Sequence, residues 1–153
     1  MKKLENIAWT FYINEDEVHK LKTDKCGKWM YFFDGSEKSI NFVKRICEQM
    51  VREGIAIETK HTSETKLMFK PSGVCCFYCD GSNIEAHKKI ISFMIENNMI
   101  QKRKTGKLYN LSFKYDTQTS NNEYGTEFES KIKLEDFIDL ETGEWLPNIN
   151  LKN

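Results

Sequence analysis

One stretch of apolar residues limits the folds open to this chain more than any other feature. Residues 74–79 are Val-Cys-Cys-Phe-Tyr-Cys. An unbroken apolar run of this length is typical of a strand that is buried on both faces. A helix is predicted next, because Ser82 and Glu85 have the spacing of a capping box, and an apolar stripe that includes His87 extends to about Asn98. The centre of the molecule is therefore expected to be a buried strand followed by a helix.

The rest of the chain predicts further strands and a second long helix. Trp9, Phe11 and Ile13 alternate along the chain, as in a strand with one buried face. The other expected elements are strands at 28–34, 55–60 and 108–115, a helix at 39–53 that ends at Gly54, an edge strand or hairpin arm at 67–69, a loop or short helix at 16–25 and a loop at 117–126. This order predicts an α/β (α+β) fold: a curved, largely antiparallel sheet with two main helices packed on one face.

Composition narrows the class of protein. The chain has 153 residues, 39% hydrophobic and 30% charged, which suits a single domain over 1–153 with a sizeable core. The 23 Lys and Arg residues equal the 23 Asp and Glu residues, so bulk attraction to nucleic acid or to an anionic membrane is not expected. A local basic site remains open. The basic loop 102–104 leaves RNA contact as an unfavoured option, since a solvated loop is the usual explanation.

Several features bear on location and cofactors. No apolar run is long enough to cross a bilayer, and the first residues lack a signal-peptide core, so a cytoplasmic location is expected. Five cysteines without framework spacing indicate free thiols in a reducing compartment. Cys76 and Cys79 form a C-x-x-C inside a predicted strand, where zinc binding is not expected. We therefore expect neither a metal nor a cofactor.

Three stretches in a fixed order resemble a known group of proteins. They are the strand start Gly27-Lys28-Trp29, the buried strand 74–79 with the helix after it, and a strand that runs into residues 113–119, which are Phe-Lys-Tyr-Asp-Thr-Gln-Thr. This arrangement resembles the translation initiation factor 4E-like superfamily. The resemblance implies a curved sheet with helices on one face.

Within that superfamily the chain is most similar to the basophilic leukaemia-expressed protein family, which carries the label of a phosphothreonine lyase domain. That family shows a Gly-Lys-Trp strand start, a lysine late in the strand after the first helix (here Lys60), and a Tyr-Lys-Pro-Asp-x-x-Thr stretch followed by a tyrosine. This chain has Phe113 and Tyr115 in place of the tyrosine and the proline. The likeness covers 27–124, and residues 125–153 form a C-terminal extension.

The resemblance implies a ligand site. Lys28, Lys60 and Lys114 would converge on a phosphate or another dense anion, as ammonium groups do. Asp116 would orient a lysine or bind a ligand hydroxyl, and Thr119 and Tyr124 would donate hydrogen bonds to phosphate oxygens. The alternatives remain open: exposed lysines at strand ends are common, and Asp and Thr side chains often satisfy turn backbones.

Cap-binding relatives stack a methylated guanine between tryptophans. Here Trp29 and Trp9 are expected to pack in the core, so cap recognition is not predicted, while Trp145 fits either role. The leading hypothesis is a protein that binds a phosphorylated small molecule, with nucleotides and nucleotide-derived signals as the first candidates.

Two alternatives remain. The first is a phosphoester-acting enzyme, a lyase or hydrolase, with Lys60 or Lys114 as base and His61 as acid. Against it, neighbouring strand residues point to opposite faces, and no catalytic motif is present. The second is a protein-interaction module or inhibitor, from a phage or mobile element.

Overall fold

The structure is a computed structural model that describes residues 1–120 and 131–151. Its strands are β1 (Lys2–Glu5), β2 (Trp9–Ile13), β3 (Cys26–Asp34), β4 (Glu58–Thr62), β5 (Ser72–Asp80), β6 (Ser112–Tyr115) and β7 (Ile132–Lys133). Its helices are α1 (Glu37–Arg52), α2 (Glu64–Leu67), α3 (Ile84–Glu96) and α4 (Asp116–Ser120), with short 3-10 turns η1 (Val18–Lys20) and η3 (Leu134–Asp136).

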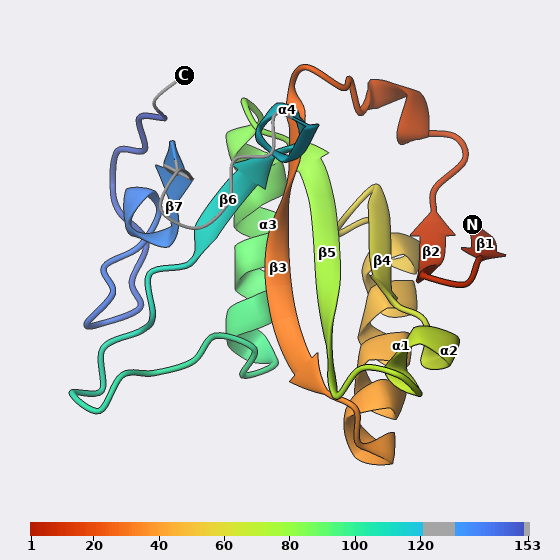
Figure 1. Cartoon of the computed structure of the whole chain (residues 1–153). Coiled ribbons are helices and arrows are strands. Elements are labelled where there is room, and N and C mark those ends of the chain that lie inside the picture. The colour runs from red at the N-terminus through yellow and green to blue at the C-terminus, as the bar shows by residue number, and fades with distance from the viewer. Residues whose placement is uncertain (121–130, 152–153) are drawn as a thin grey trace.

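The strands form one seven-stranded sheet in the order β1-β2-β4-β5-β3-β6-β7, and every neighbouring pair is antiparallel. The two long helices, α1 and α3, lie on the same side of this curved sheet, whose centre is the pair β3 and β5 (Figure 1). The expected α+β class, with an antiparallel curved sheet and two main helices on one face, is confirmed.

The strand register decides which side chains face the helices. Tyr12, Thr59, Phe77 and Trp29 stand opposite one another across four adjacent strands, so their side chains share one face of the sheet. All four are buried, and Trp29 and Phe77 belong to the hydrophobic core with residues of α1 and α3. This row therefore marks the helix-covered face, and residues one position away along each strand lie on the other face.

Several local predictions need correction. Residues 67–69 are not an edge strand, because Leu67 is the last residue of α2 and residues 68–69 form a turn. The Ser63 hydroxyl caps the start of this helix by accepting a hydrogen bond from the Lys66 N–H at 3.1 Å. The cap of α3 is Asn83, whose side chain accepts from the Ala86 N–H at 3.1 Å. Ser82, predicted to be the cap, instead bonds to Asp80.

The strand predicted at 108–115 is shorter and covers only Ser112–Tyr115. Strand β1 was not predicted. In the described part of the chain, no helix has the length and apolar character needed to span a membrane. All five cysteines are free and buried, as expected for reduced thiols.

Candidate functional site

The three candidate lysines come from three different strands and share the helix-free face of the sheet. Lys28 of β3 stands directly opposite Lys114 of β6 and, on its other side, opposite Tyr78 of β5. Lys60 of β4 stands opposite Cys76, the residue two positions before Tyr78 on the same face. We call the helix-free side around these residues the lysine face. Its further members are Trp9, Phe11, Met30, Glu58 and, at the start of α4, Asp116.

The three residues of the Gly27-Lys28-Trp29 motif have different structural roles. Trp29 is fully buried in the core, and Lys28 points to the opposite face. Gly27 permits a close approach of β6: a Cβ added there would lie 2.6 Å from the carbonyl oxygen of Lys114 and equally close to the ring of Phe113. The glycine therefore lets β6 place Lys114 directly beside Lys28.

Asp116 links α4 to the lysine face. Its carboxylate oxygens accept a hydrogen bond from the Lys28 ammonium at 3.4 Å and one from the Cys26 thiol at 3.2 Å. Lys28 is 8% exposed and Lys114 only 6%, so both residues are largely buried. Burial and the Asp116 carboxylate together raise the pKa of Cys26 to about 12, which keeps this thiol protonated and unreactive.

Lys60 has an aromatic surrounding. Its Nζ lies 3.9 Å from the ring centroid of Trp9, 5.7 Å from that of Phe11 and 5.9 Å from that of Tyr78. Among the ion pairs between described residues, none includes Lys60. Burial, and to a smaller extent the positive charge of Lys28, lower the pKa of the Lys60 ammonium, against the opposing influence of Cys76, Asp116 and Glu58.

The ring of Tyr78 connects the two halves of the face. The Lys28 Nζ lies 5.8 Å from its centroid, nearly the same distance as the Lys60 Nζ. Glu58 stands opposite Tyr78 on β4, and burial is the main cause that raises the pKa of the Glu58 carboxyl. The structure thus brings Lys28 and Lys60 to the same aromatic side chain, with Asp116 paired to Lys28 and Lys114 directly opposite Lys28.

The remaining predicted ligand residues are placed less fully. Thr119 lies in α4, the turn that begins with Asp116 and follows β6. Tyr124 lies outside the described residues. Only the backbone position of Thr119 can therefore be related to the lysine face.

His61 is not part of this face. It follows Lys60 on β4 and points to the helix-covered side, where it is 2% exposed. Its Nδ1 bonds to the carbonyl of Thr62 at 2.9 Å, and its Nε2 contacts the Tyr12 hydroxyl at 3.3 Å. Burial lowers the pKa of His61. The expectation that the neighbouring residues Lys60 and His61 point to opposite faces of the sheet is confirmed by this geometry.

The tryptophans divide between the two faces. Trp29 is a core residue, as predicted, and its indole N–H donates to Nδ1 of the fully buried His87 at 3.0 Å. The prediction that Trp9 packs in the core is wrong, because its register partner Thr62 and its contact with Lys60 place it on the lysine face. Trp145 forms an isolated bridge with Ile138 and is 37% exposed.

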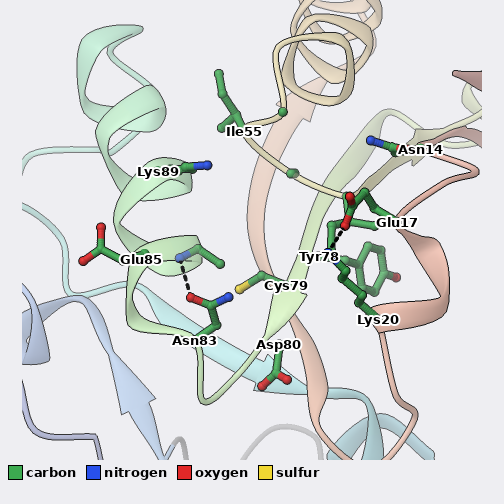
Figure 2. A pocket seen from close by; sticks show the side chains of 14 residues that line it. Asn14, Glu17, Lys20, Ile55, Tyr78, Cys79, Asp80, Asn83, Glu85 and Lys89 are labelled. Atoms are coloured by element: carbon green, nitrogen blue, oxygen red, sulfur yellow. Dashed lines mark hydrogen bonds and ion pairs between the residues drawn. The ribbon is translucent and has the colours of Figure 1, made fainter.

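The largest of the described cavities shares Tyr78 with the lysine face, but its other lining residues are different. It has a volume of about 520 Å³ and opens between the start of α3, residues 54–57 and the segment that includes Asn14 and Glu17. Figure 2 shows Lys89 projecting from α3 toward this cavity, while Glu17 is occupied by an ion pair with Lys20 on the far wall. Its mixed charges and backbone lining do not form a concentrated cationic site, and none of the three candidate lysines lines it.

Sequence reasoning missed the aromatic members of the lysine face. Trp9, Phe11 and Tyr78 were each assigned to strands, but nothing in one strand alone shows which of its two faces meets the helices. The signal was present in the alternation, since Trp9 and Phe11 share a face with one another and lie opposite Thr62 and Lys60 in β4. Only the pairing of β2 with β4 brings the aromatic rings to the lysine.

No protein-family model matches this chain, and no curated protein is similar enough in sequence to count as its relative.

Proposed function

We propose that this chain binds a phosphorylated small molecule on the lysine face, with nucleotides and nucleotide-derived signals as the first candidates. The observation that carries the proposal is the shared position of Lys28 and Lys60 beside the ring of Tyr78, with Lys114 directly opposite Lys28. Asp116 pairs with Lys28, and the positive side chains that converge here from three strands favour the approach of a dense anion.

The chemistry of the face suits an anion that also carries an apolar or planar part. Ammonium groups bind phosphate as point charges, and hydrogen bonds to charged groups contribute about 1.5–3 kcal/mol each. The half-buried rings of Trp9 and Phe11 offer apolar surface next to these charges. Asp116 would orient Lys28 through the contact that it already makes. In this proposal Thr119 and Tyr124 add hydrogen bonds to phosphate oxygens.

Calorimetric titration of the folded protein tests the proposal, with inorganic phosphate, pyrophosphate and a panel of nucleotides. We expect Lys60→Ala and Lys114→Ala to weaken binding by roughly ten- to a hundredfold, the equivalent of one charged hydrogen bond. Lys38→Ala, at an exposed position of α1, is the matched control and should bind normally. Lys89→Ala reports on the large cavity near α3.

Two results would contradict the proposal. One is the absence of binding by protein that is shown to be folded. The other is binding that Lys114→Ala leaves unchanged or that Lys89→Ala abolishes, since the ligand would then occupy a different place.

One observation favours the enzymatic alternative enough to test it. A lysine whose pKa is lowered by burial, as that of Lys60 is, suits a general base. We expect turnover of a phosphopeptide or nucleotide, if it occurs, to disappear in Lys60→Ala and to persist in His61→Gln, because His61 faces the core. Stoichiometric binding without product would exclude it.

We also propose that the likeness to the initiation factor 4E-like superfamily, and to the basophilic leukaemia-expressed protein family within it, reflects a common fold. The single curved sheet with both long helices on one side supports this relation. An experimental structure that superimposes poorly on members of that superfamily over 27–124 would reject it.

A further inference from the structure

Lys60 differs from the other lysines that the structure describes in what surrounds its nitrogen. The nearest ring, that of Trp9, lies 3.9 Å from Nζ, and the rings of Phe11 and Tyr78 complete an aromatic enclosure. No ion pair with a described carboxylate holds the ammonium. The residue as a whole is half-buried, and it lies on the face of the sheet that the two long helices do not cover.

We propose that Lys60 is a reactive amine that forms an imine with a carbonyl compound bearing a phosphate group. This inference rests on the proposed function, because Lys28 and Lys114 would hold the phosphate while the carbonyl carbon meets Nζ of Lys60. It assigns one class of ligand, phosphorylated aldehydes and ketones, to the lysine face.

The surroundings of Lys60 favour both the neutral amine that reacts and the protonated imine that forms. Only the neutral amine attacks a carbonyl, and both burial and the nearby Lys28 charge disfavour the ammonium form. The opposing effects, which favour the ammonium form, are the influence of Cys76, Asp116 and Glu58 and the attraction between a cation and the Trp9 ring. The cation–ring attraction amounts to about 0.5–2 kcal/mol. A protonated imine is also a cation, so it retains that attraction after the bond has formed. The attraction to the Trp9 ring therefore stabilises the protonated imine as well as the ammonium form of Lys60, and it does not oppose imine formation.

The step balances without an oxidant or reductant. The lone pair of the Lys60 nitrogen forms a bond to the carbonyl carbon, the carbon–oxygen double bond opens, and a proton moves from the nitrogen to the oxygen to give a hydroxyl. This hydroxyl takes a second proton from a carboxylic acid, the carbon–oxygen bond breaks, water leaves, and the nitrogen lone pair forms the carbon–nitrogen double bond of the protonated imine. Glu58 lies on the same face two residues earlier in β4, and its raised pKa suits a carboxyl that lends and recovers the proton.

Pyridoxal 5′-phosphate, a phosphorylated aldehyde, is the probe. The folded protein is mixed with a limiting amount at neutral pH, imines are fixed with borohydride, and the label on each lysine is measured by peptide mass spectrometry. We expect most of the label on Lys60 and loss of that label in Lys60→Arg. Lys38→Arg is the matched control and should keep it. Pyridoxal, which has no phosphate, should label Lys60 several-fold less.

Labelling that follows simple exposure, with Lys38 and other surface lysines modified as much as Lys60, would overturn the inference. The peptide map of the unaltered protein decides this point even if Lys60→Arg fails to fold. Calorimetry with pyrophosphate, which has no carbonyl, separates the two proposals. Pyrophosphate binding with Lys60 unlabelled rejects the reactive amine and leaves the anion site in place. Equal labelling by pyridoxal and its phosphate, without pyrophosphate binding, rejects the phosphate requirement and the proposed function together.

Discussion

Replacing Gly27 with alanine tests whether the close packing of β6 against β3 sets up the lysine face. The added Cβ would lie 2.6 Å from the backbone oxygen of Lys114 and 2.6 Å from the Phe113 ring, so β6 must shift. Overpacking of this kind costs about 1–3 kcal/mol, and alanine recovers roughly 0.5–1 kcal/mol relative to glycine inside a strand. Because one of the atoms that must move is a backbone oxygen, the overpacking cost lies in the upper part of this range, about 2–3 kcal/mol, and the net destabilisation is about 1–2.5 kcal/mol. For a chain of this length it lowers the melting temperature by about 2–10 °C.

Thermal unfolding followed by circular dichroism measures this shift. Gly35→Ala is the matched control, because its Cβ would meet only the Pro71 carbonyl group, with the oxygen at 3.4 Å and the carbon at 3.8 Å, which are ordinary contacts. The displaced β6 also carries Lys114, so Gly27→Ala should weaken pyrophosphate binding while Gly35→Ala should not. Equal melting temperatures for the two variants would refute the packing argument, and normal pyrophosphate binding by Gly27→Ala would refute the link to the site.

Three further outcomes follow from the structure. Both ring nitrogens of His87 are used, Nε2 toward the Gly81 carbonyl at 2.8 Å and Nδ1 as acceptor from Trp29, and burial lowers its pKa. Neutral His87 therefore stabilises the fold fully above about 6.5, the pKa of a histidine in the unfolded chain, and this stabilisation is lost as the pH falls below that value. The urea midpoint should decline from pH 7 to pH 5, and it should decline less in His87→Gln. Trp29→Phe removes the indole donor and should cost at least about 1 kcal/mol in a urea titration at pH 7, whereas a neutral result would deny that bond any weight. Asp116→Asn should lower the pKa of Cys26 and speed its alkylation at pH 9, since the carboxylate is one cause of the raised value; an unchanged rate would show that burial alone controls the thiol.

The central elements could be predicted from sequence because their apolar patterns are strong. The continuous run in β5 and the stripe of α1 both correspond to buried residues in the structure. Strand β1 gave no such signal: all four of its residues are exposed at the outer edge of the sheet, so neither alternation nor an apolar face marks it. An edge strand of this kind is visible only once its partner β2 is placed.

Apolar residues outside the core misled the sequence argument elsewhere. Met68 and Phe69 are 79% and 85% exposed, although their hydrophobicity suggested an edge strand or a hairpin arm. Trp9 misled in the same way, since the lysine face is itself partly aromatic. Hydrophobicity alone does not separate a core from an apolar outer face, and the distinction came from strand register.

The lysines themselves were identified through a resemblance, while their convergence came from strand order. Lys28 and Lys114 are far apart in the sequence, and only the placement of β6 next to β3 sets them side by side. The role of Asp116 as partner of a lysine was anticipated, and the structure gives it Lys28.

The alternation in β4 makes the strand intolerant of a change in length. Glu58 and Lys60 face outward while Thr59 and His61 face the helices. Deleting one residue from the preceding loop and shifting the pairing by one position would send Lys60 into the core and bring His61 to the surface. Such a slip would bury a charge and empty the proposed site in one event, although the composition of the strand would be almost unchanged. Point substitutions along β4 should therefore be accepted far more readily than single-residue insertions or deletions.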